Sequence, residues 1–414
     1  MVEINRQRLL DRFLTYVQVG SGADPNAQTY PSSEGQRELG SILADQLRNM
    51  GADDVIQDEH ALVYGTIPAT VPGTLPTVAL FAHVDTSPDA PNVSVRPHVV
   101  ENYDGEDLLL ASGEIIRVQA CPELESLQGK TLITTDGTTL LGGDDKAGVA
   151  ILMELAETLI ENPHLPHGPV KLVFTCDEEI GRGTDKIDLE RLAATVGYTI
   201  DGGGAGIIDV ETFSADGATV NVIGDNIHPA IAKDRMVNAV RGASDFIAKL
   251  PRDSHTPETT EKRQGFIHVN HVSGGVGECQ IDLLLRSFDA ADLEAYAKQL
   301  RDIAAQVESD WPGMKVNVQV HRQYRNLGDG LAELPEAVTL AEEAFSNLGR
   351  SCVKEIIRGG TDGSVLTEKG LPTPNLSSGQ HNIHSVREFA CLDEMIAATE
   401  HVVELLSLWS NQRS

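Results

Sequence analysis

The stretch TVALFAHVD, residues 77–85, is a mostly apolar run that ends in a histidine and an aspartate. An unbroken apolar run of this length is typical of a strand that is buried on both faces of a sheet. Similar runs follow at 170–175 and 197–200, and an amphipathic helix is predicted at 146–160, between the first two strands. Strands that alternate with helices predict an α/β domain.

Further helices and strands are predicted toward both ends of the chain. Residues 6–19 and 34–50 have helical periodicity, and Gly51 stands where the second of these helices would be capped. Three more elements are predicted in the last part of the chain: strands at 352–357 and 373–376 and a helix at 389–409. They continue the alternation of an α/β domain.

Residues 217–321 have a different pattern. The predicted elements are a strand at 218–223, a long helix at 230–250, strands at 266–272 and 279–288, a helix at 289–307 and a strand at 314–321. The order βαββαβ is that of a ferredoxin-like unit. We therefore expect an α/β domain formed by residues 1–214 and 327–414, interrupted by an inserted α+β domain at 215–326.

Composition excludes several classes of partner. The 414 residues include 32 Lys and Arg against 62 Asp and Glu, and the formal net charge is −30. Such a charge repels phosphate backbones and anionic membranes, so we expect neither nucleic acid nor a membrane as a partner. The five scattered cysteines form no CxxC pair, and neither a secretory h-region nor a membrane-length apolar run is found. These features predict a cytoplasmic protein.

Histidines and acidic residues follow the predicted core strands, where open α/β sheets place their ligand sites. His83 and Asp85 come directly after the first strand and, two residues apart in an extended chain, face the same way. Asp85 can then accept a hydrogen bond from one imidazole nitrogen while the other nitrogen binds a metal. Taken alone, the pair also fits a solvated loop.

Three more acidic motifs and one late histidine extend this pattern. The motifs are GGDDKAG at 142–148, CDEE at 176–179 and DGGG at 201–204, and the histidine is His384. Singly, they fit a helix N-cap, a solvated turn and ordinary loop residues. Together, oxygen and imidazole ligands without cysteine predict a two-metal hydrolytic site, with an aspartate bridging ions about 3.5–4 Å apart.

Five motifs resemble those of the co-catalytic dinuclear zinc metallopeptidases, a family that also holds aminoacylases and dipeptidases. They are HVDTSPD at 83–89, LLGGDDKAG at 140–148, DEE at 177–179, DGGG at 201–204 and RGGTDG at 358–363. The similarity runs nearly the whole length, and residues 101–146 are most similar to the tripeptide-cleaving members. It implies an α/β catalytic domain with an inserted ferredoxin-like lid or dimerisation domain.

The resemblance also implies a site for two zinc ions per subunit. Its metal ligands would be His83, Asp144, Glu179, Asp201 and His384. Asp144 would bridge both ions, and Asp85 would orient His83. Glu178 would be the general base for a metal-held hydroxide that attacks the peptide carbonyl. Adjacent residues point apart, so one base and one ligand at 178–179 is physically reasonable.

Three residues further along the chain are implied to act on the substrate. His228 of the inserted domain would stabilise the oxyanion, although it also fits a turn before the next helix. Arg286 and Arg358 are candidates for holding the substrate carboxylate, or else form structural ion pairs. His381 departs from the family pattern, and whether this extra histidine competes for metal with His384 is left open.

The implied function is removal of the N-terminal residue from tripeptides, with small peptides as substrates. The inserted domain is the expected contact if the chain forms a homodimer. A related dipeptidase or N-acyl amino acid amidohydrolase would use the same metal core. A catalytically silent metal-binding protein is the alternative from another class, but such a protein would not need the base Glu178.

Overall fold

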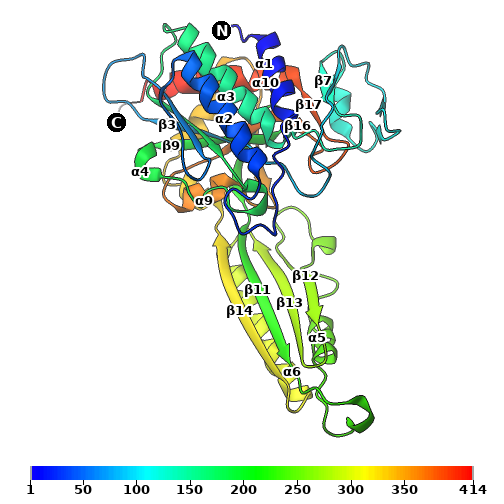
Figure 1. Cartoon of the computed structure of the whole chain (residues 1–414). Helices are drawn as coiled ribbons and strands as arrows, with labels where there is room; N and C mark the ends of the chain where they lie inside the picture. The colour runs from blue at the N-terminus through cyan, green and yellow to red at the C-terminus, as the bar shows by residue number, and fades with distance from the viewer. Residues whose placement is uncertain (1, 413–414) are drawn as a thin grey trace. The chain divides into compact units, whose positions relative to one another are not determined.

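The computed structural model describes residues 2–412, which divide into two compact units (Figure 1). Unit 1 comprises Met1–Val210, Gly330–Glu355 and Thr361–Ser414, and unit 2 comprises Glu211–Asp329 and Ile356–Gly360. Residues 356–360 were expected in the α/β domain but belong to unit 2. This difference arises because the Phe213 N–H donates to the carbonyl oxygens of Ile357 and Gly359, a contact that no local sequence pattern reveals.

Unit 1 is built on an eleven-stranded mixed sheet. Its centre is four parallel strands in the order β8 (Val170–Thr175), β3 (Val78–His83), β9 (Val196–Gly203) and β16 (Asn375–His381). Every residue of β3 is buried, as its apolar run predicts. Seven further strands extend this centre: β1 (Asp53–Gln57), β2 (Val63–Ile67), β4 (His98–Val100), β7 (Leu132–Thr134), β10 (Ile207–Thr212), β15 (Val353–Ile357) and β17 (Phe389–Cys391).

The helix α3 (Gly143–Glu161) is the centre of the helical layer of unit 1. It packs on β3, β9 and β16 and is contacted by α1 (Arg6–Val17), α2 (Glu34–Met50) and α10 (Leu392–Trp409) (Figure 1). Gly51 ends α2 in the left-handed conformation with φ 92°, as predicted. The remaining short elements are α4 (Leu189–Leu192), α7 (Leu327–Leu331), α8 (Glu336–Asn347), α9 (Asp362–Glu368), η1 (Pro122–Leu127), η2 (Glu178–Ile180), and the hairpin β5 (Leu108–Leu109) and β6 (Ile115–Ile116).

Unit 2 has the predicted α+β architecture. Four antiparallel strands lie in the order β12 (Phe266–Gly274), β13 (Glu278–Ser287), β11 (Ser214–Ile223) and β14 (Lys315–Tyr324). The helices α5 (Ala239–Ala248) and α6 (Ala290–Asp310) pack against them and share one apolar core. Chain order and strand order together are those of a ferredoxin-like unit.

Two helix predictions were wrong in extent. The helix predicted at 230–250 is only α5, because the side chain of Asn238 accepts from the N–H groups of Val240 and Arg241 and starts the helix there. The preceding residues form the 3₁₀ turn η3 (Pro229–Ile231), and unit 2 has a second such turn, η4 (Pro257–Thr259). The terminal helix begins at Leu392, because the first three residues of its predicted range form β17.

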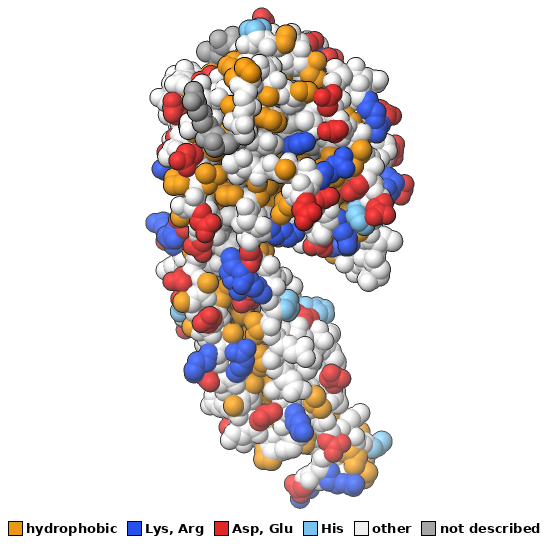
Figure 2. Space-filling view, turned by 90° about the vertical axis from the view of Figure 1, so that its left-hand side faces the viewer, with side chains coloured by type: hydrophobic (Ala, Val, Ile, Leu, Met, Phe, Trp, Pro, Cys, Tyr) orange, Lys and Arg blue, Asp and Glu red, His pale blue; other side chains and the backbone are white. Residues whose placement is uncertain are grey.

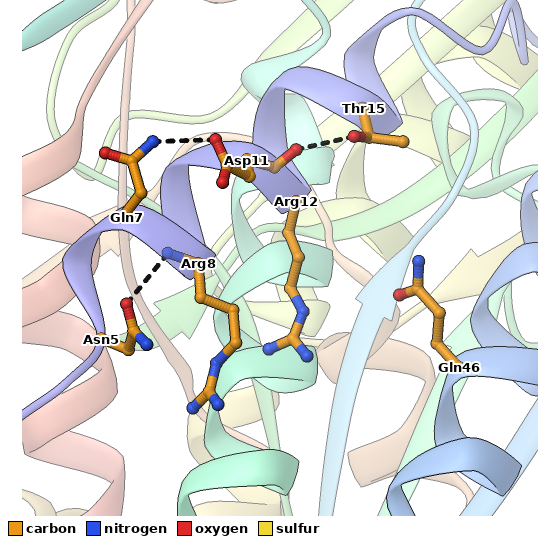
Figure 3. A pocket seen from close by; sticks show the side chains of 7 residues that line it. All are labelled: Asn5, Gln7, Arg8, Asp11, Arg12, Thr15 and Gln46. Carbon is orange, nitrogen blue, oxygen red and sulfur yellow. Dashed lines mark hydrogen bonds between the residues drawn. The ribbon is translucent and has the colours of Figure 1, made fainter.

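A buried ion pair joins α1 to α3. The Glu154 side chain has no exposed surface; Arg8 donates to both of its oxygens at 2.7 and 2.8 Å, and Arg12 donates at 2.7 Å. Both arginines extend from the same side of α1, beside a surface hollow that they line (Figure 3). A carboxylate is costly to bury without such partners, so the pair fixes how α1 sits on α3.

The surplus of negative charge is not gathered into one patch on the face that Figure 2 shows. There, acidic side chains occur over both units, and Lys and Arg lie among them. Within residues 2–412, no helix combines the length and the apolar composition that crossing a membrane requires.

Replacing Glu154 by glutamine tests the ion pair. We expect Glu154→Gln to lower the free energy of unfolding by about 3–5 kcal/mol, because two arginines lose a buried charged partner. Urea denaturation followed by circular dichroism measures the change. Glu161→Gln is the matched control: this partner of Arg8 is half-exposed, and its loss should cost less than about 1 kcal/mol. Equal, small effects of both variants would contradict a structural role for the buried pair.

His401 of α10 predicts an acid-sensitive contribution to stability. The ring stacks on Phe345 with centroids 3.6 Å apart, its Nε2 lies 2.9 Å from the Ala341 carbonyl oxygen, and burial lowers its pKa from 6.5 to about 4. At a pH between these two values, His401 is therefore protonated in the unfolded chain and neutral in the folded chain. The stabilisation is complete above pH 6.5 and is lost as the pH falls through about 4.

Unfolding measured between pH 7 and pH 4 should show this contribution as up to about 3 kcal/mol of pH dependence. His401→Gln should lose that dependence, whereas His164→Gln, at an exposed position, should keep it. If wild type and His401→Gln lose stability in parallel on acidification, His401 is not the responsible group.

Candidate metal centre

The carboxyl ends of the four central parallel strands bring the predicted site residues to one edge of the sheet. His83 is the last residue of β3, Asp201 lies near the end of β9, and His384 follows β16. Residues 178–179 follow β8 in the turn η2. Because these strands are neighbours in the sheet, their ends meet at one edge, as the sequence pattern predicts.

Asp144 completes two groups of potential metal ligands. In the first, His83 Nε2 lies 3.0 Å from Asp144 Oδ1 and 3.7 Å from Asp201 Oδ1. In the second, His384 Nε2 lies 3.4 Å from Asp144 Oδ2 and 3.0 Å from Glu179 Oε2. The structure thus brings all five predicted ligands together around one aspartate, which offers one oxygen to each group.

Hydrogen bonds turn the Nε2 atoms of both histidines toward the acids. His83 Nδ1 lies 3.1 Å from the Asp85 carbonyl oxygen and 3.4 Å from its carboxylate. His384 Nδ1 lies 2.9 Å from Asp89 Oδ2 and 3.2 Å from the Ser87 hydroxyl. Partners on the second ring nitrogen of this kind fix the orientation of metal-binding histidines. Asp89, inside the HVDTSPD motif, was not singled out by the sequence analysis.

Asp85 has a second task that the sequence did not reveal. Its two carboxylate oxygens accept hydrogen bonds from the backbone N–H groups of Glu178 and Glu179, each at 3.1 Å. It therefore links the end of β3 to the turn that carries the predicted base and one predicted ligand. The contact joins residues more than ninety positions apart, so spacing alone gave no sign of it.

Only one of the two aspartates of the GGDD motif, Asp145, caps the helix. Gly142 precedes α3 in the left-handed conformation with φ 79°, but the Asp144 and Asp145 backbone is not helical, so the regular part of α3 begins at Lys146. Asp144 faces the two histidines, whereas Asp145 accepts from the His83 N–H and from the Gly148 N–H, both at 3.1 Å. Asp145 thus ties the end of β3 to the start of α3.

Asp177, the first acid of the DEE motif, is a buried structural anchor. Its carboxylate accepts from the N–H of Ser32 at 2.9 Å and from Gln36 Nε2 at 2.7 Å, and the Ser32 hydroxyl also contacts it. In return, Gln36 Oε1 accepts from the Asp177 N–H at 3.0 Å. These bonds hold the turn of Glu178 and Glu179 against the start of α2.

The electrostatics of the two groups fit divalent cations. Burial and the nearby Asp144 charge raise the pKa of Asp201 to about 7, and burial likewise raises that of Glu179 to about 7. Glu179 Oε1 is buried and, among the described residues, has no hydrogen-bond partner. An unpaired buried carboxylate oxygen is costly, and a cation would relieve that cost. Carboxylate and imidazole groups are also ligands that zinc accepts.

The structure places His381, the extra histidine of the loop before His384, away from the two ligand groups. Among the described residues it joins neither ligand group. Its Nε2 lies 2.6 Å from Glu394 Oε2, and its ring stacks on Phe389 with centroids 4.8 Å apart. These contacts hold the His381 ring on the C-terminal segment.

His228, Arg286 and Arg358 belong to unit 2. His228 is exposed, and its Nδ1 accepts from the Ala230 N–H at 3.2 Å, which matches the turn residue considered above. Arg286 donates to two backbone carbonyl oxygens at 3.0 and 3.1 Å. Arg358 donates to two others at 2.7 and 2.8 Å and to the Thr260 hydroxyl at 2.9 Å. Their roles toward a substrate stay predictions.

Comparison with known proteins supplies the family. Peptidase T of Geobacillus thermodenitrificans is 39% identical over 411 residues, which cover 99% of this chain and all of that protein. The crystal structure of a tripeptidase from Staphylococcus aureus is 26% identical with a TM-score of 0.77, and that of the aminopeptidase PepT from Bacillus cereus is 25% identical with a TM-score of 0.75. Both alignments cover 99% of this chain and 100% of the other.

A dinuclear metal-binding M20 peptidase from Bacillus subtilis shares the fold at 15% identity, with a TM-score of 0.66 and 98% of each chain covered. Residues 136–408 match the family model described as Peptidase family M20/M25/M40. The predicted fold class and the prediction of a hydrolase acting on peptide bonds are confirmed. The sequence, the ligand geometry and the relatives agree, and this chain belongs to peptidase family M20/M25/M40.

Proposed function

We propose that this chain is a dinuclear zinc aminopeptidase that releases the N-terminal residue of tripeptides. The observation that carries the proposal is the pair of ligand groups that share Asp144, with Glu178 beside them. The substrate class is supported by relatives that are named peptidase T and tripeptidase. Unpaired cysteines at all five positions suit a reducing compartment such as the cytoplasm.

Five side chains would hold the metals. His83 and Asp201 would bind one ion, His384 and Glu179 the other, and Asp144 both. When bound, two zinc ions would act as Lewis acids and lower the pKa of a water molecule toward about 7. Because Asp85 and Asp89 already orient the two histidines, little rearrangement would be needed to bind them.

Glu178 would move the proton. Its backbone N–H is fixed by Asp85, and burial raises the pKa of its carboxyl well above the usual range. A carboxylate with a raised pKa accepts a proton from the attacking water more readily and returns it to the departing amine. In unit 2, His228 is the proposed oxyanion donor, and Arg286 and Arg358 are the proposed partners of the substrate carboxylate.

Other activities on the same metal core remain testable alternatives. A dipeptidase would prefer the shorter substrate, and an N-acyl amino acid amidohydrolase would accept a blocked amine. A silent metal-binding protein would bind metal without turnover. The proposal also includes a homodimer formed through unit 2, for which sedimentation is the direct measurement.

A peptide series separates these activities. We expect free alanine to be released from Ala-Ala-Ala but not from Ala-Ala, Ala-Ala-Ala-Ala or N-acetyl-Ala-Ala-Ala, because recognition of both peptide ends limits the length. Chromatography of the products, with and without a chelator and after zinc is added back, measures this. Preferred cleavage of the dipeptide or of the acetylated peptide would assign a sister activity instead.

Variants at two adjacent glutamates test the assigned base and ligand separately. Glu178→Gln should lower kcat about 10²–10⁴-fold, because the amide cannot accept the proton, while both metals stay bound. Glu179→Gln should instead weaken binding of one metal. Turnover and metal content, measured on the same samples, distinguish the two. Unchanged turnover in Glu178→Gln would show that another group is the base.

A further inference from the structure

Glu388 is a buried carboxylate to which the proposed chemistry gives no role. It lies four residues after His384, just before β17, and is 1% exposed. Its Oε2 accepts from the N–H groups of Leu141 at 2.7 Å and Gly142 at 2.8 Å, and its Oε1 accepts from the N–H of Asp144 at 3.0 Å. One carboxylate therefore binds three backbone N–H groups of the loop that leads into α3.

That loop cannot satisfy these donors by itself. Leu141 and Gly142 precede α3, and Asp144 is not helical, so their N–H groups are not used by the hydrogen bonds of the helix. The Asp145 side chain caps the regular helix by accepting from the Gly148 N–H, and it leaves the N–H groups of residues 141–144 to other partners. Glu388 accepts from three of these loop N–H groups, although it lies more than 240 residues further along the chain.

The position of Asp144 decides whether both ligand groups exist. Its two oxygens lie 3.0 Å from His83 Nε2 and 3.4 Å from His384 Nε2, so a shift of the Asp144 backbone would disturb both groups together. The Asp144 N–H is bonded directly to Glu388. The segment 384–388 thus supplies one predicted ligand and the anchor of the shared ligand.

We propose that Glu388 is a positioning residue for the metal pair. It fixes the backbone of residues 141–144 so that the single carboxylate of Asp144 serves both ligand groups, without itself binding metal. This inference rests on the proposed function, because it takes the two groups to be metal sites. It predicts that a change at Glu388 weakens both metals, whereas a change at Glu179 weakens one.

The arrangement requires a carboxylate and not merely a polar side chain. Both oxygens of Glu388 accept hydrogen bonds from N–H groups, and only a carboxylate offers two acceptor oxygens and no donor. In Glu388→Gln, one of these oxygens becomes an NH₂ group. The NH₂ would then face either the N–H of Asp144 or those of Leu141 and Gly142, so donors would oppose one another in either orientation.

Zinc affinity of the full chain, measured by competition with a chromophoric chelator, tests the proposal. We expect Glu388→Gln to bind both zinc ions about 10–100-fold more weakly than wild type. Glu154→Gln is the control, because it also removes a buried carboxylate of unit 1, but one that pairs with Arg8 and Arg12 and not with a predicted ligand. This variant should be less stable than wild type and should keep wild-type zinc affinity. Thermal unfolding of the metal-free proteins reports the stability of each variant.

Glu388→Asp separates hydrogen-bond geometry from charge. It keeps the charge but is one methylene shorter, so it should also weaken both zinc ions. Wild-type affinity in Glu388→Gln, or affinity lost in Glu388→Gln but fully kept in Glu388→Asp, would overturn the proposal. Failure of the wild-type chain to bind two zinc ions would instead overturn the proposed function. That result does not depend on any Glu388 variant, so the two failures can be told apart.

Discussion

The shared carboxylate of Asp144 is the interaction on which the site depends. Burial alone would raise its pKa, yet the hydrogen bonds with His384 and His83 hold that pKa below its ordinary value. The pKa values of the neighbouring acids Asp201 and Glu179 are raised instead, because both are buried and lie close to the charge of Asp144. An arrangement of this kind concentrates negative charge where two cations would neutralise it.

The fold solves the problem of holding so many charged groups at fixed distances. Four neighbouring parallel strands bring four of the five predicted ligands and the predicted base to one edge, and the start of α3 brings Asp144 to the same place. Hydrogen bonds of side chains at this edge then connect the segments: Asp85 joins the end of β3 to the turn after β8, and Asp145 joins β3 to α3. The carboxylates of Asp85 and Asp145 thus hold the backbone of neighbouring segments in place in addition to adding negative charge to the site.

More distant segments add to this support. The start of α2 holds the turn of Glu178 and Glu179 through Asp177, and the segment before β17 holds the entry to α3 through Glu388. In the helical layer, Arg8 and Arg12 fix α1 on α3 through the buried Glu154. Buried carboxylates that bind backbone or arginine groups thus recur throughout unit 1, which accounts for part of the acidic composition without invoking an acidic partner surface.

Local sequence determined the strands, the ligand motifs and the βαββαβ order of the insertion, because each depends on periodicity or on residues at most a few positions apart. The motifs that contain His83, Asp144, Glu179, Asp201 and His384 stood out for that reason, and the resemblance to the metallopeptidase family then selected these five residues as the expected ligands. Only the tertiary structure decided what Asp89, Asp177 and Glu388 bind and where His381 points, whereas the N-cap Asn238 of α5 is a local signal that the sequence analysis missed. Most of these roles depend on partners brought close by the sheet from far along the chain, and hydrogen bonding between such groups leaves no mark on local periodicity.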